Sequence, residues 1–363
     1  MADFNQQQAF LFMPDISGFT KFVNETEIEH STHIIQELLE IIVNANELNL
    51  DLLEIEGDAV FFFRLGKLPA ASEIIQQTRA IFEKFHQHLL KYEIRRVCQC
   101  GACRTANNLT LKFIIHAGPV GSFHVGNNFK LIGKDIIILH RLLKNSIPLN
   151  EYLLFTEPFF GILETEKLNN QKLSAINERE EFDNVLVNYK YVPIHHWLQD
   201  IKMPDEDKAE IQAKLVPVIT VSREINSSAG KLFSYIADLS KRVEWMNGVK
   251  KIEYISNEKI NQSGTIHKCI IENNSSLLLK TNYFEHDGDD DFSIMEIDAK
   301  KKAFGHQFTV EQVTAESSKI TIQFLVKNNP VHKAMFSIFM KNKIVNNLKK
   351  SIENLRLKFE AGI

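Results

Sequence analysis

Two kinds of hydrophobic spacing alternate along the first 150 residues. Apolar side chains recur at helical spacing over residues 30–46, with polar side chains facing away, and this predicts an amphipathic helix. A similar stripe predicts a second helix over residues 70–92. Short runs of branched and aromatic residues at 10–14 and 109–118 instead predict strands. This part of the chain therefore mixes helices with strands.

Two hairpins complete the pattern of the first half. Two apolar segments flank the turn pair Gly57-Asp58, which suits a tight hairpin. Residues 121–133 predict another hairpin with Gly126-Asn127 at its turn, and residues 134–145 return to helical spacing. The order strand, helix, strand, strand, helix, strand is the split βαβ order of a ferredoxin-like domain.

The second half begins with a different pattern. A strand at 216–225 and a helix at 229–239 precede alternating strands between 249 and 326, and a long helix is expected over 331–361. One long terminal helix packed across a curved antiparallel sheet accounts for this order.

A polar, charged segment over residues 196–215 separates the two patterns and is the best linker candidate. We therefore expect an α+β protein with a domain at 1–195 and a second domain at 216–363. A length of 363 residues makes two domains the default.

Composition narrows the function classes. The chain has 44% hydrophobic and 24% charged residues, which is ordinary for a globular protein. A net charge of -4 gives no long-range attraction to phosphate backbones, so we expect no nucleic-acid partner. The start of the chain does not resemble a signal peptide, and no apolar stretch reaches the roughly 18 residues of a membrane span. A cytoplasmic protein is expected.

Three of the four cysteines crowd into "CQCGAC" as Cys98, Cys100 and Cys103. Such short spacings make a poor disulfide framework and favour reduced thiols. Three soft ligands could hold one Zn²⁺ ion, with His116 or Cys269 completing a tetrahedron. The alternatives are plain reduced thiols, or a redox-sensitive cluster made more acidic by the nearby arginines, which are Arg95, Arg96 and Arg104.

Two aspartates are candidates for a second cation site. Asp15 follows the first strand, and Asp58 lies on the first hairpin. A ferredoxin-like sheet brings these positions together, and paired carboxylates suit hard ions such as Mg²⁺ or Mn²⁺. The alternative is that Asp15 caps a helix beginning near Gly18 and that Asp58 serves its turn.

Four segments in order resemble class III nucleotidyl cyclase domains: "FMPDISGFTKF", "EIEGDAVFFF", "IIHAGPVGSFHVG" and "LIGKDIIILHRLLKNS". The resemblance covers about residues 8 to 195. It implies a metal-dependent cyclase, a phosphorus-oxygen lyase in which the ribose 3′ oxygen attacks the α-phosphate and pyrophosphate leaves. The combination of the cysteine-rich segment with "TEIEHS" is similar to a bacterial family of cyclase-like proteins without an assigned activity.

The resemblance also implies roles for individual residues. Asp15 and Asp58 would be the metal ligands, assisted by the backbone of Ile16. Main-chain N–H groups at a helix start would bind the triphosphate of a nucleoside triphosphate, and these belong to Gly18, Phe19 and Thr20. Arg141 would steady the transition-state phosphate across a homodimer interface.

The base and ribose positions depart from the family pattern. Glu54 matches the position that is glutamate in guanylyl cyclases, so GTP is favoured over ATP, although Glu54 could equally be an exposed strand residue. Lys134 stands at the purine-recognising position, with Asp135 one step displaced. Ile137 replaces the asparagine that orients the ribose. Either the substrate is held differently, or the domain binds it without turnover.

The segment "VSREINSSAGKLFSYIADLSKRVEWMNGVKKIEYI" resembles the opening of START-like helix-grip domains, the polyketide-cyclase and lipid-transfer superfamily. The resemblance implies an apolar cavity between the sheet and the long helix, with an apolar ligand. Aromatic residues of this region could line it or form plain core: Phe233, Trp245, Phe284, Phe308, Phe324, Phe336 and Phe339. Surface or core roles are expected for the histidines, which are His267, His286, His306 and His332.

Two hypotheses follow from these resemblances. In the first, the protein is a homodimeric signalling cyclase whose output is regulated by a ligand of the C-terminal domain. In the second, cyclase activity is lost, and the protein is a sensor or scaffold whose START-like domain binds a lipid or another apolar molecule.

Overall fold

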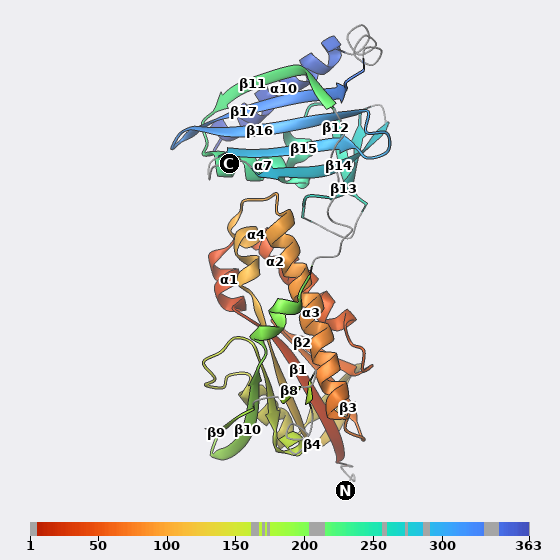
Figure 1. The fold of residues 1–363 in the computed structure, drawn as a ribbon, viewed down its shortest axis with the longest axis vertical. Helices are drawn as coiled ribbons and strands as arrows, with labels where there is room; N and C mark the ends of the chain where they lie inside the picture. Colours follow the sequence, from red (N-terminus) through yellow and green to blue (C-terminus); the bar gives the residue numbers. More distant parts are fainter. Residues whose placement is uncertain are drawn as a thin grey trace. The chain divides into compact units, whose positions relative to one another are not determined.

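The computed structural model describes residues 6–160, 167–168, 171–172, 175–202, 215–255, 260–272, 275–285, 291–329 and 341–362. The chain divides into two compact units (Figure 1). The first comprises Met1–Leu90 and Thr105–Met203, and the second comprises Lys91–Arg104 and Pro204–Ile363. Each unit combines helices with a sheet, so the predicted α+β class is confirmed.

The sheet of the first unit has the strand order β2-β3-β1-β4-β6-β10-β9, with β5 paired to β4. Its first four members give the ferredoxin-like arrangement that the sequence predicted. The strands are β1 (Gln7–Ser17), β2 (Asp51–Glu56), β3 (Ala59–Leu65), β4 (Thr110–Val125), β5 (Asn128–Ile132), β6 (Tyr152–Thr156), β9 (Ile176–Phe182) and β10 (Val185–Pro193). The short strands β7 (Lys167–Leu168) and β8 (Gln171–Lys172) pair separately.

The helices predicted over residues 30–46, 70–92 and 134–145 are all present, with ends shifted by a few residues. The helical segments up to residue 202 are α1 (Phe19–Glu25), α2 (Ile28–Asn44), α3 (Ala71–Arg95), α4 (Gly101–Thr105) and α5 (Lys134–Leu142), with short 3-10 turns η1 (Ala106–Asn108), η2 (Glu157–Phe159) and η3 (His195–Asp200). The turn η3 falls inside the expected linker, and residues 203–214 lie outside the described residues.

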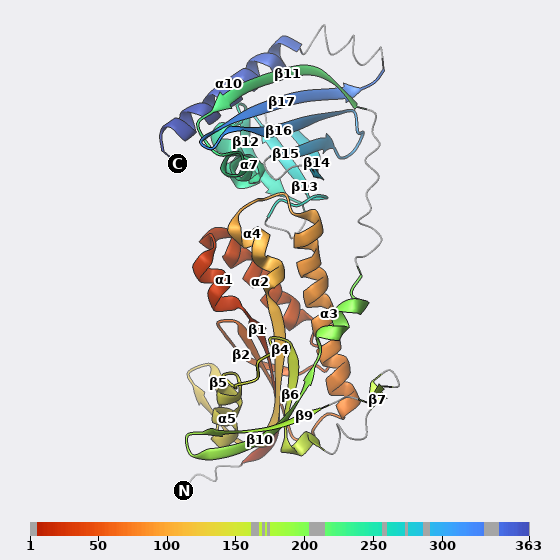
Figure 2. The same ribbon diagram turned by 60° about the vertical axis from the view of Figure 1, so that its left-hand side comes forward.

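Alternation along β1 decides which way Asp15 points. Ala9, Leu11 and Met13 belong to the apolar cluster that contains side chains of α5, which lies beside β5 in Figure 2. The intervening Phe12 instead stacks on Phe113. Successive strand residues face opposite sides of a sheet, so Asp15 shares the side of Met13. The carboxylate therefore lies on the face covered by α5.

The second unit is built on a seven-stranded antiparallel sheet with the order β11-β17-β16-β15-β14-β13-β12. The strands are β11 (Leu215–Ile225), β12 (Val249–Tyr254), β13 (Ile266–Ile271), β14 (Ser276–Glu285), β15 (Asp291–Asp298), β16 (Phe304–Thr314) and β17 (Ser317–Lys327). The helical elements are α7 (Ala229–Ala237), η5 (Leu239–Lys241), α8 (Arg242–Trp245) and α10 (Lys341–Glu360).

Helix α10 packs against this sheet, as the sequence predicted for the terminal helix (Figure 2). Leu348, Ile352, Leu355 and Phe359 recur every three or four residues, so they form one apolar stripe. The stripe joins a core that includes Trp245. Residues 330–340, the expected first part of this helix, lie outside the described residues.

Candidate functional site

The two aspartates predicted to hold a cation lie at neighbouring positions of the first sheet. Asp15 pairs with Ala59 across β1 and β3, and the Ile16 amide donates to the Asp58 carbonyl at 3.1 Å. Burial and the nearby Asp15 carboxylate raise the pKa of Asp58 to about 6. Burial is the larger cause and repulsion by Asp15 the smaller one, and a cation between the two carboxylates would relieve that repulsion.

The alternative role for Asp15 as a helix cap is wrong. Asp15 lies within β1, and helix α1 begins after Gly18, which adopts the left-handed φ of 89°. No side chain accepts a hydrogen bond at this helix start. The side chain of Asp15 is therefore not used as a helix cap. Asp58 does lie in the turn between β2 and β3, as both interpretations require.

Lys112 is a member of this site that sequence reasoning missed. It lies directly opposite Asp15 in the β1–β4 pairing, and its Nζ is 3.0 Å from Asp15 Oδ2. The same ammonium group donates to the Leu143 carbonyl at 2.9 Å. The two carboxylates are the oxygen ligands that a divalent cation takes, and Lys112 leaves this group of three side chains with a single negative charge. Only the register between β1 and β4 places Lys112 opposite Asp15, and a single sequence does not give that register.

The polar residues expected to recognise substrate are engaged in ion pairs. Lys130 on β5 donates to the Glu54 carboxylate, so Glu54 is not a solitary exposed strand residue. Arg141 Nη2 lies 2.9 Å from Asp183 Oδ2, and both side chains are at least half exposed. A nucleotide that used these residues would have to displace their present partners.

The residues around the expected purine position are also partly occupied. Asp135 lies 3.0 Å from His116 Nε2, and His116 Nδ1 lies 2.7 Å from Thr156 Oγ1. A Cβ on Gly118 would come 2.1 Å from Asp135 Cγ, so only glycine admits this arrangement. Lys134 is exposed at the start of α5.

Ile137 is 58% exposed on α5, so the position of the family asparagine carries no hydrogen-bonding group. The predicted phosphate segment lies at the start of α1, a helix of seven residues. Thr20 is exposed there. The side chain of Phe19 lines an apolar groove of about 650 Å³ between α1, α2 and β2.

The cysteine segment forms a compact cluster. All four cysteines are free thiols, and the sulfur atoms of Cys98, Cys100 and Cys103 lie within 4.8 Å of one another in the second unit. Backbone amides also point at sulfur: the Cys100 amide donates to Cys98 Sγ at 3.5 Å and the Cys103 amide to Cys100 Sγ at 3.4 Å. Three thiols on one short segment supply soft ligands that suit Zn²⁺.

The prediction that His116 or Cys269 completes this cluster is wrong. His116 is bonded to Asp135 and Thr156, and Cys269 lies on β13. For Cys103, the alternative of a thiol made more acidic by the nearby arginines is wrong. Hydrogen bonds with the neighbouring thiols, together with burial, raise the pKa of the Cys103 thiol.

The second unit contains a cavity of about 300 Å³ between the sheet and α10. Its wall is mostly apolar, and its apolar lining residues are Met246, Val249, Ile252, Ile271, Leu277, Leu279, Phe304, Phe324, Ile344 and Leu348. Five buried polar residues also line it, of which four are ionisable: Arg242, His267, Glu296, His306 and the neutral Ser351. The cavity has the mixed lining that small-molecule sites commonly show.

Of the aromatic residues expected around this cavity, Phe324 lines it. Phe233, Trp245 and Phe308 are fully buried core residues, which the plain-core alternative predicted. Phe336, Phe339, His286 and His332 lie outside the described residues, as does the side chain of Phe284.

Two family models match the chain. One, described as "Protein of unknown function (DUF2652)", matches residues 35–152. The other, described as "Polyketide cyclase / dehydrase and lipid transport", matches residues 217–360. The second match confirms the resemblance that the sequence of the C-terminal region predicted.

A curated relative, the uncharacterized protein Rv2561/Rv2562 of Mycobacterium tuberculosis, is 32% identical over 121 residues. This match covers 33% of the present chain. It covers 56% of the relative, so the chain spans about half of that protein's length.

Solved structures similar to about half of the chain include the adenylyl cyclase CyaB from P. aeruginosa, with 14% identity, a TM-score of 0.36 and coverage of 52% of this chain and 95% of that one. They also include the guanylate cyclase domain of RhGC from Catenaria anguillulae in complex with GTP, with 14% identity, a TM-score of 0.36 and coverage of 51% and 96%.

Among the described residues, we find no helix that is both long and apolar enough to span a lipid bilayer.

Proposed function

We propose that the protein is a ligand-binding sensor whose second unit takes up a small apolar molecule. The observation that carries this proposal is the cavity of about 300 Å³ between the sheet and α10. A cavity of this size is at the lower end of the range for small-molecule sites. Its apolar wall supplies the binding free energy, because each apolar surface that meets the ligand is removed from water.

Calorimetric titration with naphthalene and toluene tests this function. We expect saturable binding at one site per chain. Ile344→Trp puts a larger side chain on the wall and should weaken binding at least tenfold. Leu357→Trp is the matched control, because Leu357 lies on the same helix but is 51% exposed. The absence of saturable binding, or an equal loss in both variants, would refute the sensor function.

A second candidate function is carried by the carboxylates of Asp15 and Asp58. We propose that they hold one Mg²⁺ or Mn²⁺ ion and, with the backbone of Ile16 and the start of α1 from Gly18 to Thr20, a nucleoside triphosphate. Glu54 and Lys134 would face the base, and GTP is favoured over ATP. Lys112 and Ile137 argue for binding with little or no turnover, because one cationic partner is already present and the ribose lacks an orienting amide.

Binding and turnover need separate measurements. The protein should be titrated with each NTP and Mn²⁺ by calorimetry, and then assayed for pyrophosphate and a cyclic product. We expect binding that Asp58→Asn abolishes, with Asp51→Asn, on the neighbouring β2, as the matched control. Rapid cyclic product formation would overturn the low-turnover part of the proposal. Unchanged nucleotide binding in Asp58→Asn would remove the site itself.

We further propose a homodimer of the first unit. The groove of about 650 Å³ exposes Ile28, Leu52 and Ile55, while the β4–β5 hairpin of the same unit exposes Val125 and Ile132. A concave and a protruding apolar surface on one chain can engage a second copy, and Arg141 would then act across that interface. Large exposed apolar patches are typical of sites that bind another protein.

Sedimentation velocity tests the dimer. Val125→Asp should shift the protein toward monomer, whereas Leu186→Asp, which changes an equally exposed residue on β10, should not. A wild-type protein that stays monomeric at micromolar concentration would contradict the proposal.

The cysteine cluster is proposed to hold one structural Zn²⁺ ion. Support comes from the compact set of thiols and from the amide-to-sulfur hydrogen bonds, which stabilise thiolate ligands. Ligand sets rich in cysteine thiolates are typical of structural zinc.

A further inference from the structure

Four buried ionisable side chains on the cavity wall of the second unit gather around Glu296, and we call this cluster the polar pole. It consists of Arg242 from α8, His267 from β13, Glu296 from β15 and His306 from β16. Each of these side chains is at least nine-tenths buried. Burying four ionisable residues on the wall of an apolar cavity costs folding free energy unless each is hydrogen-bonded or paired. The hydrogen bonds that these residues make, and those that they leave open, therefore indicate what the pole can bind.

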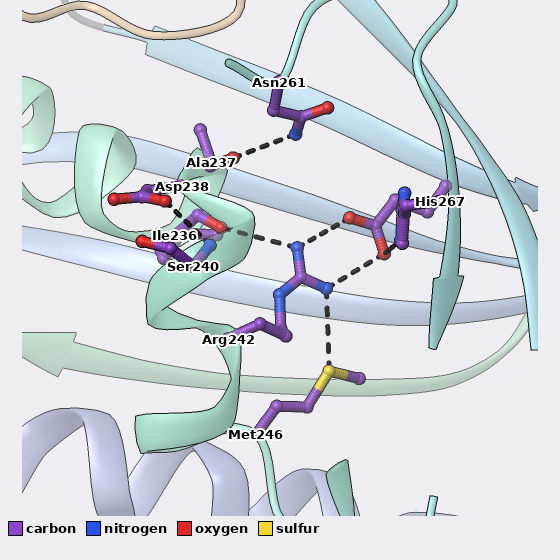
Figure 3. Close-up of polar contacts among 9 residues, drawn as sticks. Ile236, Ala237, Asp238, Ser240, Arg242, Met246, Asn261 and His267 are labelled. Carbon is purple, nitrogen blue, oxygen red and sulfur yellow. Dashed lines mark hydrogen bonds and ion pairs between the residues drawn. The ribbon is translucent and has the colours of Figure 1, made fainter. Parts of the chain in front are cut away.

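Arg242 and Glu296 satisfy each other. Arg242 Nη1 and Nη2 donate to the two carboxylate oxygens of Glu296 at 2.9 and 2.6 Å. The guanidinium also contacts the Ile236 carbonyl and the Met246 sulfur, as Figure 3 shows. Burial opposes the charge on Glu296, but Arg242 outweighs it and holds the pKa of the carboxyl below its usual value. The pair is therefore ionised and carries no net charge.

The two histidines are neutral near pH 7. Burial lowers the pKa of His306 to about 4, and burial also lowers the pKa of His267. His306 lies directly opposite Glu296 in the sheet, while His267 Nε2 is 3.9 Å from Glu296 Oε2, beyond hydrogen-bond range. The polar pole as a whole is thus electrically neutral.

The imidazoles offer hydrogen bonds that no described residue satisfies. His267 has no partner at either Nδ1 or Nε2, and His306 has none at Nδ1. A neutral imidazole carries one N–H donor and one acceptor nitrogen. Leaving such buried groups unpaired costs about 1–3 kcal/mol each. The pole therefore presents both a donor and an acceptor to whatever enters the cavity.

We propose that the polar pole recognises an uncharged hydroxyl group, so the ligand of the second unit is a small apolar alcohol or phenol. The hydroxyl donates to one imidazole nitrogen and accepts from another, while the apolar body lies against residues such as Leu279 and Ile344. A carboxylate would have to compete with Glu296 for Arg242, and an ammonium group would meet the guanidinium. This inference deepens the sensor function proposed above and rests on it.

Probes that share a skeleton and differ in one group test the inference. We would titrate the full-length protein with naphthol, naphthalene and naphthoate, and with the single-ring series cresol, toluene and toluate. The hydroxyl compound of each series should bind about tenfold more tightly than the hydrocarbon, the equivalent of one good hydrogen bond. The carboxylate should bind more weakly than the hydroxyl compound. Equal or tighter binding of the carboxylate would overturn the proposal and point to one of the two cationic side chains of the wall: Arg242, whose Nε lacks a partner among the described residues, or the exposed Lys343.

One variant distinguishes the contribution of the polar pole to binding from that of the apolar cavity wall. His267→Phe keeps a ring but removes both nitrogens, so the preference for the hydroxyl should disappear while hydrocarbon affinity remains. Retained hydrocarbon binding also reports that the variant is folded. His196→Phe, at an exposed histidine, is the matched control and should leave the preference unchanged.

The two levels of the proposal fail in different ways. The polar pole does not recognise a hydroxyl group if hydrocarbon and hydroxyl compounds bind equally to the unaltered protein. The same conclusion follows if the preference for the hydroxyl compound persists in the double variant His267→Phe/His306→Phe. If no probe of either series binds, the sensor function itself is refuted.

Discussion

The ammonium group of Lys112 lies 3.0 Å from a carboxylate oxygen of Asp15, on the strand next to it in the sheet. This contact places a fixed positive charge beside the first of the two proposed cation ligands. Such a charge lowers the affinity for a divalent ion, because the ion and the ammonium group compete for the same oxygen.

Replacing Lys112 by methionine should therefore strengthen cation binding. Lys112→Met removes the charge and keeps an unbranched side chain, and we expect about tenfold tighter Mn²⁺ binding, or about 1.4 kcal/mol. Mn²⁺ titration followed by electron paramagnetic resonance measures this directly. Lys67→Met, on the exposed surface of the same unit, is the control. Unchanged or weaker Mn²⁺ binding in Lys112→Met would show that the lysine does not compete with the ion.

The second prediction concerns the buried pair in the polar pole. Arg242→Met leaves Glu296 buried without its partner, and removing one member of such a pair typically costs about 3–5 kcal/mol. Arg223→Met is the matched control, because Arg223 pairs with Glu353 on the surface of the same unit, where ion pairs contribute about 0–1 kcal/mol.

The two tryptophans allow this loss to be assigned to one unit. Trp197 is buried in the first unit and Trp245 in the second. In a Trp197→Phe background, urea unfolding followed by Trp245 fluorescence reports the second unit alone. Similar losses in the Arg242 and Arg223 variants would mean that the buried pair contributes no more than a surface one.

Local periodicity explains which parts of the fold could be predicted. The apolar stripes of α2 and α3 and the turn at Gly57-Asp58 are local signals, so the ferredoxin-like order followed from them. The pairing of Asp15 with Asp58 followed as well, because the hairpin of β2 and β3 packs directly against β1.

The rest depended on contacts between residues far apart in the chain. The partnership of Lys112 with Asp15 depends on the register between β1 and β4, and that of Arg242 with Glu296 joins a short helix to a distant strand. No spacing rule within one segment reports such contacts. His267 and His306 were expected to be surface or core residues, and their position on a cavity wall became visible only in the folded sheet.

The third prediction is a loss of stability of the second unit in mild acid. Burial lowers the pKa of His306 to about 4, so between pH 6.5 and pH 4 the unfolded chain binds a proton that the folded unit does not. Stability is then fully present above pH 6.5 and falls as the pH is lowered toward 4. The expected loss from His306 is about 2 kcal/mol at pH 5.

The lowered pKa of His267 acts in the same direction, and Glu296 adds to the loss at still lower pH. Urea midpoints read from Trp245 at pH 7 and pH 5 measure the change. His306→Phe should remove the share of His306 and flatten the dependence. An unchanged midpoint at pH 5, or an equal fall in the variant, would show that His306 is not held neutral by burial.

The last prediction concerns the zinc ion proposed at the cysteine cluster. Protein purified without added metal and analysed by inductively coupled plasma mass spectrometry should contain one zinc ion per chain. Cys98→Ser, Cys100→Ser and Cys103→Ser should each lower that content by at least half, because serine is a much weaker ligand for Zn²⁺ than a thiolate. Cys269→Ser is the matched control, since Cys269 is also a buried free thiol but lies outside the cluster. A zinc content near zero in the unaltered protein, with no uptake after Zn²⁺ is added under reducing conditions, would leave the cluster as a set of reduced thiols.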